Sequence, residues 1–141
     1  SSHLKWIEWI KDHLKVDIPF PIISDPLGIV ATQLGMISPE KGTNTVRAVF
    51  IIDEKGVVRC VLYYPQEIGR NINEILRIIK ALQISDEFNV AIPANWPYNS
   101  IMNSNVLLKA PKTVSEAQKR LEDAKSQGYS CYDFWFCVKS L

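Results

Sequence analysis

The sequence predicts an α/β fold, because two apolar segments typical of strands are followed directly by an amphipathic helix. The first segment, Val46 to Ile52, is apolar except for Arg47 and rich in β-branched residues, as expected for a strand buried on both faces. The second, Val57 to Tyr64, alternates between two faces and ends at Pro65, which has no N–H for a strand ladder. Gly56 lies in the turn between them, where it can adopt a positive φ.

A helix is expected after the second strand. Asn71 followed three residues later by Glu74 is a capping pattern. Apolar residues then recur at helical spacing: Ile72, Ile75, Leu76, Ile79 and Leu82. Strand, turn, strand and helix form half of a two-layer core, and we expect Arg47 to be the one cation buried in it.

The chain begins with a predicted amphipathic helix. Ser1 and Ser2 can cap it, and its apolar positions fall at helical spacing: Leu4, Ile7, Ile10 and Leu14. A domain rarely begins with so apolar a helix without a strand before it. We therefore expect an N-terminal part of the domain to be missing from this sequence.

The next segment predicts a short strand and a second helix. Phe20 to Ser24 is expected to be the strand, and Asp25 to cap a helix that has Pro26 at its first position and Gly35 at its end. Ser38 to Asn44 is a polar loop. The resulting order, α-β-α-β-β-α, fits a thioredoxin-like sheet from which the first βαβ unit has been removed.

The character of the sequence changes after Ser85. Prolines and asparagines then alternate with short apolar segments, which predicts a long irregular arm. Ser115 to Lys125 is expected to be a short charged helix capped by Thr113. The arm ends in an aromatic segment, Tyr129 to Cys137, which must be covered by the chain's own core or by another subunit.

Composition excludes several classes of protein. The chain has 141 residues, 47% hydrophobic and 22% charged, as in a globular domain, and its net charge of +1 argues against nucleic acid or an anionic membrane as partner. No apolar run approaches the roughly 20 residues that span a bilayer. With no signal peptide at its start, the sequence predicts a cytoplasmic protein.

Arg47 is the first candidate for chemistry. An arginine does not lose its proton in a protein, so when buried it needs an anionic or strongly dipolar partner. A salt bridge to a core carboxylate and a catalytic role explain it about equally well.

The three cysteines are the second candidates. Cys131 and Cys137 are six positions apart, and extended chain of that length spans about 20 Å, much more than a disulfide allows. We therefore expect them not to bond each other unless the segment folds back. Each is either a small buried hydrophobe or the partner of a thiol elsewhere. Cys60 lies within a strand and is expected to be inert.

The sequence predicts neither a metal nor an organic cofactor. No Cys-x-x-Cys pair or neighbouring histidine completes a zinc ligand set, and there is no glycine-rich phosphate loop. His3 and His13 have no acid and serine at a readable spacing, so we interpret both as structural or exposed.

Several blocks of the sequence together resemble the peroxiredoxins, in particular the one-cysteine-like, peroxiredoxin 6 type and its long-armed archaeal members. The blocks are HLKWIEWI, PFPIISDPLGIVATQLG, TVRAVFIIDEKGVVRCVLYYP, IGRNINEILRIIKALQ, VAIPANWP and the terminal CYDFWFC. The resemblance implies a thioredoxin fold and reduction of hydrogen peroxide and organic hydroperoxides by a peroxidatic cysteine. The motif of that cysteine, Pro-x-x-x-Thr-x-x-Cys, does not occur in this sequence. We therefore expect the chain to be the C-terminal portion of a peroxiredoxin, inactive by itself.

The resemblance also assigns roles to residues. Arg47 falls on the active-site arginine, which holds the peroxidatic sulfur as thiolate, and Arg70 on an arginine that supports the active-site region. Cys137, with Cys131 as second choice, falls on the arm cysteine that resolves the sulfenic acid. Residues 1–84 would be the C-terminal part of the thioredoxin-like domain, and residues 85–141 an extension and oligomerisation arm.

The resemblance further implies partners. These are a hydroperoxide substrate, a thiol reductant such as a thioredoxin-like protein, and further copies of the chain, bound through the strand Val57–Tyr64 and through the arm. The alternative to a peroxidase is a thioredoxin-fold module without catalysis that serves assembly or binding.

Overall fold

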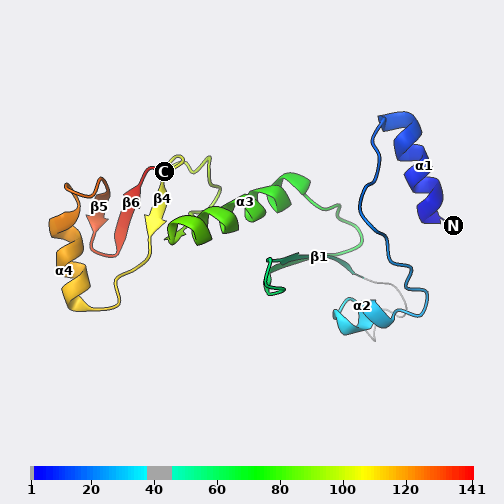
Figure 1. The fold of residues 1–141 in the computed structure, drawn as a ribbon, viewed down its shortest axis with the longest axis horizontal. Helices are drawn as coiled ribbons and strands as arrows, with labels where there is room; N and C mark the ends of the chain where they lie inside the picture. The colour runs from blue at the N-terminus through cyan, green and yellow to red at the C-terminus, as the bar shows by residue number, and fades with distance from the viewer. Residues whose placement is uncertain (1, 38–45) are drawn as a thin grey trace. The chain divides into compact units, whose positions relative to one another are not determined.

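The computed structural model describes residues 2–37 and 46–141 and divides into two compact units. The first unit comprises the chain up to Val49 together with Leu62–Gln66, and the second comprises Phe50–Val61 and Glu67–Leu141. Figure 1 shows the ribbon of both units, with labels on most of the helices and strands. The predicted cap at Ser1 and the predicted loop 38–44 lie outside the described residues.

The first unit contains two helices. α1 (Ser2–Leu14) has the predicted bounds. α2 (Ile29–Gln33) begins later than predicted, because Gly28 adopts a left-handed conformation with φ of 68° just before it. Asp25 still contributes to α2, since its Oδ2 accepts a hydrogen bond of 2.9 Å from the backbone N–H of Ala31. A side chain at position 28 would also meet Ile37, so glycine is required there.

The predicted strand at residues 20–24 is wrong. The segment belongs to no strand, and no other part of the described chain pairs with it. A strand exists only where a neighbour satisfies its backbone N–H and C=O groups, and that neighbour cannot be read from the segment itself.

Both central strands are present and form a hairpin. β1 (Arg47–Ile52) and β2 (Val58–Tyr64) make a two-stranded sheet. Asp53 closes its turn: Oδ1 accepts hydrogen bonds from the backbone N–H groups of Lys55 (3.0 Å) and Val57 (2.9 Å). The prediction that β1 is buried on both faces is wrong, since its residues are half-buried and Ile52 is exposed.

α3 (Ile72–Phe88) follows as predicted and extends beyond the expected stripe. Asn71 caps it by accepting a hydrogen bond of 3.1 Å from the backbone N–H of Glu74. Its apolar stripe is only partly covered: Ile72 and Leu76 remain 60% and 51% exposed. Within residues 2–37 and 46–141, no helix is long and apolar enough to cross a membrane.

A second sheet, which the sequence did not predict, forms in the C-terminal arm. It has four strands in the order β3-β4-β6-β5, all antiparallel. Their bounds are Val90–Ala91 (β3), Val106–Leu108 (β4), Ser130–Asp133 (β5) and Phe136–Lys139 (β6). Most of the fully covered side chains of this unit lie in it: Val90, Val106, Cys137 and Val138.

The arm also contains the predicted charged helix. α4 (Val114–Asp123) lies in the connection from β4 to β5 (Figure 1). The side chain of Thr113 caps it by accepting a hydrogen bond of 3.1 Å from the backbone N–H of Glu116. The capping prediction is therefore confirmed, and the helix ends two residues before the expected Lys125.

An ion-pair cluster joins the tip of the β1–β2 hairpin to α3. Arg59 donates hydrogen bonds to both carboxylate oxygens of Asp86, at 2.7 and 2.9 Å, and also lies 3.4 Å from Asp53. Hydrogen bonding to Arg59 lowers the pKa of Asp86 below its ordinary value. This pairing could not be predicted from the sequence, because Arg59 and Asp86 are 27 positions apart.

We predict that Asp86→Asn lowers the melting temperature by a few degrees at pH 7. Because the folded pKa of Asp86 is depressed, its contribution to stability is present above the ordinary pKa of about 3.9 and is lost as the pH falls through the folded value. Thermal unfolding measured from pH 7 to pH 3 should show the two proteins converging below about pH 4.

The matched control is Glu87→Gln, which removes a neighbouring exposed carboxylate of α3. A loss of stability from Asp86→Asn that is the same at pH 7 and pH 3 would contradict the role of the ion pair.

Candidate functional site

Arg47 is the first residue of β1 and lies in the first unit. It is half-buried, so the expectation of complete burial is wrong. The reason is that, among the strands of the described residues, β1 has β2 as its one neighbour, and so small a sheet gives its side chains little cover. Its guanidinium remains positively charged at every working pH and carries five N–H donors in a fixed plane. It is therefore suited to hold an anionic sulfur or oxygen.

Arg70 lies in the second unit, in the connection between β2 and α3, directly before the cap residue Asn71. The residue is exposed. The structure describes Arg47 and Arg70 each within its own unit, and a supporting role for Arg70 stays a prediction.

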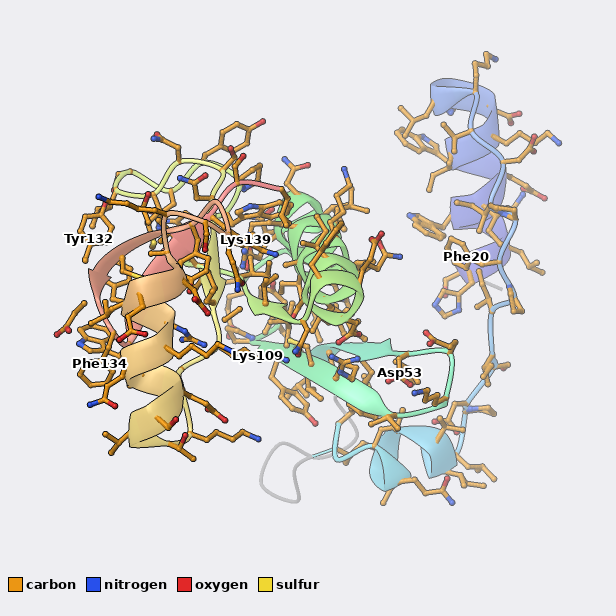
Figure 2. The ribbon with its side chains drawn as sticks, turned by 60° about the vertical axis from the view of Figure 1, so that its left-hand side comes forward. Phe20, Asp53, Lys109, Tyr132, Phe134 and Lys139 are labelled. Carbon is orange, nitrogen blue, oxygen red and sulfur yellow. A yellow bond between two sulfur atoms is a disulfide. The ribbon has the colours of Figure 1, made fainter. Side chains whose placement is uncertain are left out.

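The two arm cysteines are brought together. Cys131 on β5 lies directly opposite Cys137 on β6, with their Cα atoms 4.0 Å apart, and the sulfurs form a disulfide. Cys137 is 0% exposed, whereas Cys131 is half-buried on a strand at the edge of the sheet. Figure 2 labels Tyr132 and Phe134 on this hairpin.

The prediction that Cys131 and Cys137 would not bond each other is therefore wrong. It assumed an extended segment, but the chain reverses at Phe134 and Trp135. Asp133 stabilises the reversal: Oδ1 accepts a hydrogen bond of 2.7 Å from the backbone N–H of Phe134, and Oδ2 one of 3.1 Å from the indole N–H of Trp135. An aspartate that bonds to nearby backbone is a recognised turn signal, so Asp133 is the residue from which the reversal could have been predicted.

Aromatic contacts reinforce the same turn. The rings of Tyr132 and Phe136 stack across the hairpin with centroids 4.8 Å apart, and those of Trp135 and Phe136 stack at 5.4 Å. These contacts do not involve the sulfurs. The hairpin therefore has sources of order besides its disulfide.

Cys60 on β2 is half-buried, and its thiol is free. Over residues 2–37 and 46–141, no three side chains of the metal-binding types gather closely enough to hold an ion. The candidates for chemistry that the sequence singled out thus lie on β1, as Arg47, and in the arm, as the pair Cys131 and Cys137.

Comparison with known proteins identifies the class. The AhpC/TSA family model matches residues 1–61, and the model of the C-terminal domain of 1-Cys peroxiredoxin matches residues 81–124. The chain is 59% identical to a peroxiredoxin of Thermotoga maritima and 57% identical to one of Archaeoglobus fulgidus, each over 99% of its own length. It spans 64% and 65% of the length of these two curated relatives.

Solved structures agree. The 1-Cys peroxiredoxin of yeast mitochondria superposes with a TM-score of 0.76 at 33% identity, covering 98% of this chain and 64% of that one. A peroxiredoxin 6 of Arenicola marina gives a TM-score of 0.75 at 30% identity, covering 97% and 64%. The fold is thus the α/β, thioredoxin-like fold predicted from the sequence. The chain belongs to the peroxiredoxin family.

Loss of the arm disulfide should destabilise the second unit. In the chain-entropy model, a bridge between residues six positions apart contributes about 2 kcal/mol. We expect Cys131→Ser to lower the free energy of unfolding by about that amount, measured by urea unfolding of the oxidised protein.

Cys60→Ser, which leaves the disulfide intact, is the control and should change stability less. If oxidised wild type and Cys131→Ser unfold at the same urea concentration, the disulfide does not form in solution.

Proposed function

We propose that this sequence serves a thiol-dependent peroxidase that reduces hydrogen peroxide and organic hydroperoxides. The observation that carries the proposal is the 59% identity to a curated peroxiredoxin over 99% of the chain. The family's peroxidatic motif does not occur among these 141 residues. The chain accordingly supplies the arginine and the arm cysteines, while the attacking thiolate comes from the peroxidatic cysteine of the whole protein.

Arg47 is the catalytic residue that we assign to this chain. A peroxidatic thiolate attacks one peroxide oxygen, the O–O bond breaks, and the other oxygen leaves with the electron pair and takes up a proton. A fixed guanidinium stabilises the thiolate and the charge that develops on the leaving oxygen. We assign Arg70 to structural support of the same region.

The sulfenic acid that results must be reduced by a thiol. We propose Cys137, with Cys131 as second choice, as the resolving cysteine of the arm. A thiol reductant such as a thioredoxin-like protein would then restore the enzyme; the yeast mitochondrial relative is described as resolved through glutathione and thioredoxin systems. Such reductants are kept reduced in the cytoplasm, which is the compartment we propose.

We also propose a homo-oligomer, formed through β2 and the arm. Support comes from the open edge of the two-stranded sheet and from large apolar side chains left exposed on β2, such as Val58 (51%) and Tyr63 (54%). Residues 1–84 would belong to the catalytic domain and residues 85–141 to the arm. The match of the C-terminal family model from residue 81 supports a boundary near there.

The same exposed apolar surface favours one alternative. A thioredoxin-fold module that only assembles or binds would also present uncovered side chains on β2 and α3. Peroxide turnover distinguishes the two functions.

The 141-residue chain should show no peroxide turnover with a thiol reductant, because it lacks the peroxidatic motif. A protein that contains these residues together with that motif should reduce peroxide with a thiol reductant. In it, Arg47→Ala should lower kcat/KM by about 10²–10³, as removal of one transition-state donor does elsewhere.

Arg47→Lys, which keeps the charge but not the planar donor group, should be intermediate, and Arg70→Ala should cost less than Arg47→Ala. Steady-state assays with hydrogen peroxide measure kcat/KM for the motif-containing parent and for its three variants. Full turnover by Arg47→Ala would exclude the arginine from catalysis.

The chain should be at least a dimer at micromolar concentration. Val61→Lys places a charge on β2, where it should block edge-to-edge pairing and shift the protein toward monomer. Light scattering measures the mass. Leu27→Lys, at an exposed position outside β2 and the arm, is the matched control; a monomeric wild type would refute the proposed interface.

A further inference from the structure

The turn that follows α2 is joined by hydrogen bonds to β2 and to the residue that precedes β1, and all the residues involved lie within the first unit. The hydroxyl of Tyr63 on β2 donates a hydrogen bond of 3.2 Å to the carbonyl oxygen of Leu34, which caps the end of α2. Two residues later, the carbonyl oxygen of Met36 accepts one of 2.8 Å from the backbone N–H of Val46. Val46 directly precedes Arg47, the first residue of β1.

We propose that Tyr63 is a positioning residue for Arg47: its hydroxyl holds the turn after α2, and that turn holds the backbone from which the Arg47 side chain extends. The inference deepens the proposed function and rests on it for the role of Arg47 in catalysis. It assigns Tyr63 no contact with the reacting atoms, since the hydroxyl acts through the arginine.

The turn after α2 is closed by its own backbone, so that it transmits a constraint. Gly35 has a φ of 66° and donates to the carbonyl oxygen of Thr32 at 3.0 Å, while the N–H of Met36 donates to that of Ala31 at 2.8 Å. These two bonds and the left-handed glycine make a Schellman motif, which fixes the residues beyond a helix end relative to its last turn. A hydrogen bond to Leu34 therefore restrains Met36 as well.

Tyr63 meets this turn at close range. Its hydroxyl oxygen lies 3.8 Å from the place that a Cβ would occupy at Gly35, so the end of the side chain lies against the turn. A tyrosine has only two side-chain torsions and holds such a contact at low entropic cost. Phenylalanine would keep the ring and remove only the hydrogen bond, so the hydroxyl can be tested by itself.

Arg47 depends on the turn because it stands at the start of its strand. From Arg47 onward the chain belongs to the β1–β2 sheet, and on the other side the bond from Val46 to Met36 restrains the backbone. Donors that stabilise a thiolate and a developing oxygen charge must be placed within a fraction of an ångström. A shift of the backbone at Val46 therefore moves the guanidinium away from the position where it is useful.

The test uses the protein that contains these residues together with the peroxidatic motif. Tyr63→Phe should lower kcat/KM for hydrogen peroxide by about fivefold, the factor that corresponds to one neutral hydrogen bond. It should also raise the pKa of the peroxidatic thiol, measured from the rate of alkylation by iodoacetamide against pH, because a displaced guanidinium stabilises the thiolate less. A general loss of structure would lower the rate without that specific change, so either quantity left unchanged would overturn the proposal.

Thr32→Val is the matched control. The hydroxyl of Thr32 donates to the carbonyl oxygen of Gly28 at 2.6 Å, so this variant removes a side-chain hydrogen bond to backbone at α2 that does not reach β2. It should leave kcat/KM and the thiol pKa as they are in the parent. Equal effects of Thr32→Val and Tyr63→Phe would assign the loss to α2 itself and overturn the proposal.

The mass of the variant separates positioning from assembly, because Tyr63 lies on the strand proposed as an interface. Tyr63→Phe retains the ring, so light scattering should give the same mass for the variant and the parent. A lower mass would assign the loss of activity to assembly and would also overturn the proposal.

A double-mutant cycle separates this inference from the proposed function. Adding Tyr63→Phe to Arg47→Ala should cause no further loss, since the hydroxyl acts through the arginine. The same fivefold loss in both backgrounds would overturn the inference and leave the catalytic role of Arg47 intact. Full turnover by Arg47→Ala would instead refute the catalytic role, and the inference with it.

Hydrogen exchange tests the contact without peroxide. In the reduced protein, Tyr63→Phe should speed exchange of the Val46 N–H several-fold, because its acceptor at Met36 is held less firmly. Exchange of the Val57 N–H, which donates to Asp53, should stay the same. Mass spectrometry with residue-level fragmentation measures both, and an unchanged rate at Val46 would overturn the proposal whatever the protein's activity.

Discussion

The antiparallel pairing of β4 with β6 is the contact on which the C-terminal unit depends. It places Leu107 opposite Val138 and joins strands that are separated in sequence by α4, β5 and the loops beside them. Two of the least exposed side chains in the described structure, Val106 and Cys137, lie on these strands. Because β6 is held from one side by β4 and from the other by β5, it is the fixed strand of the hairpin, and β5 is the open one.

This arrangement separates the two cysteines chemically. Cys137 on the central strand is covered completely by its neighbours, while Cys131 on the edge strand is half-buried. The register that brings Cys131 opposite Cys137 therefore leaves the two residues with different exposure.

The β1–β2 hairpin depends on a different interaction, namely the hydrogen bonds that the carboxylate of Asp53 accepts at its turn. One carboxylate oxygen of Asp53 accepts hydrogen bonds from backbone N–H groups of the turn, and the other lies near Arg59. The guanidinium of Arg59 in turn donates hydrogen bonds to Asp86 on α3. Backbone hydrogen bonding to Val57 lowers the pKa of Asp53, so the carboxylate stays charged where the turn needs an acceptor. A strand pair with little apolar cover is thus ordered at its tip by local hydrogen bonds and by one long-range ion pair.

The sequence by itself determined those features that rest on residues close together along the chain. The caps at Asn71 and Thr113, the turn containing Gly56 and the helix from Ser2 each involve partners within about four positions, and all were predictable. The peroxiredoxin family could also be predicted from the sequence, because the resemblance rests on several long blocks of residues. The assignment of Arg47 to the catalytic arginine rests on the same blocks and stays a prediction.

Tertiary structure decided what depends on distant neighbours. The segment at residues 20–24 has the composition of a strand but pairs with no other described segment. The arm, with short apolar segments between prolines, forms a four-stranded sheet because its strands pair with one another. Two predictions were wrong for the same reason: that Arg47 is buried, and that Cys131 and Cys137 do not bond each other. Propensity acts within a few residues, but strand pairing, burial and disulfide formation depend on which residues the folded chain brings within a few ångströms.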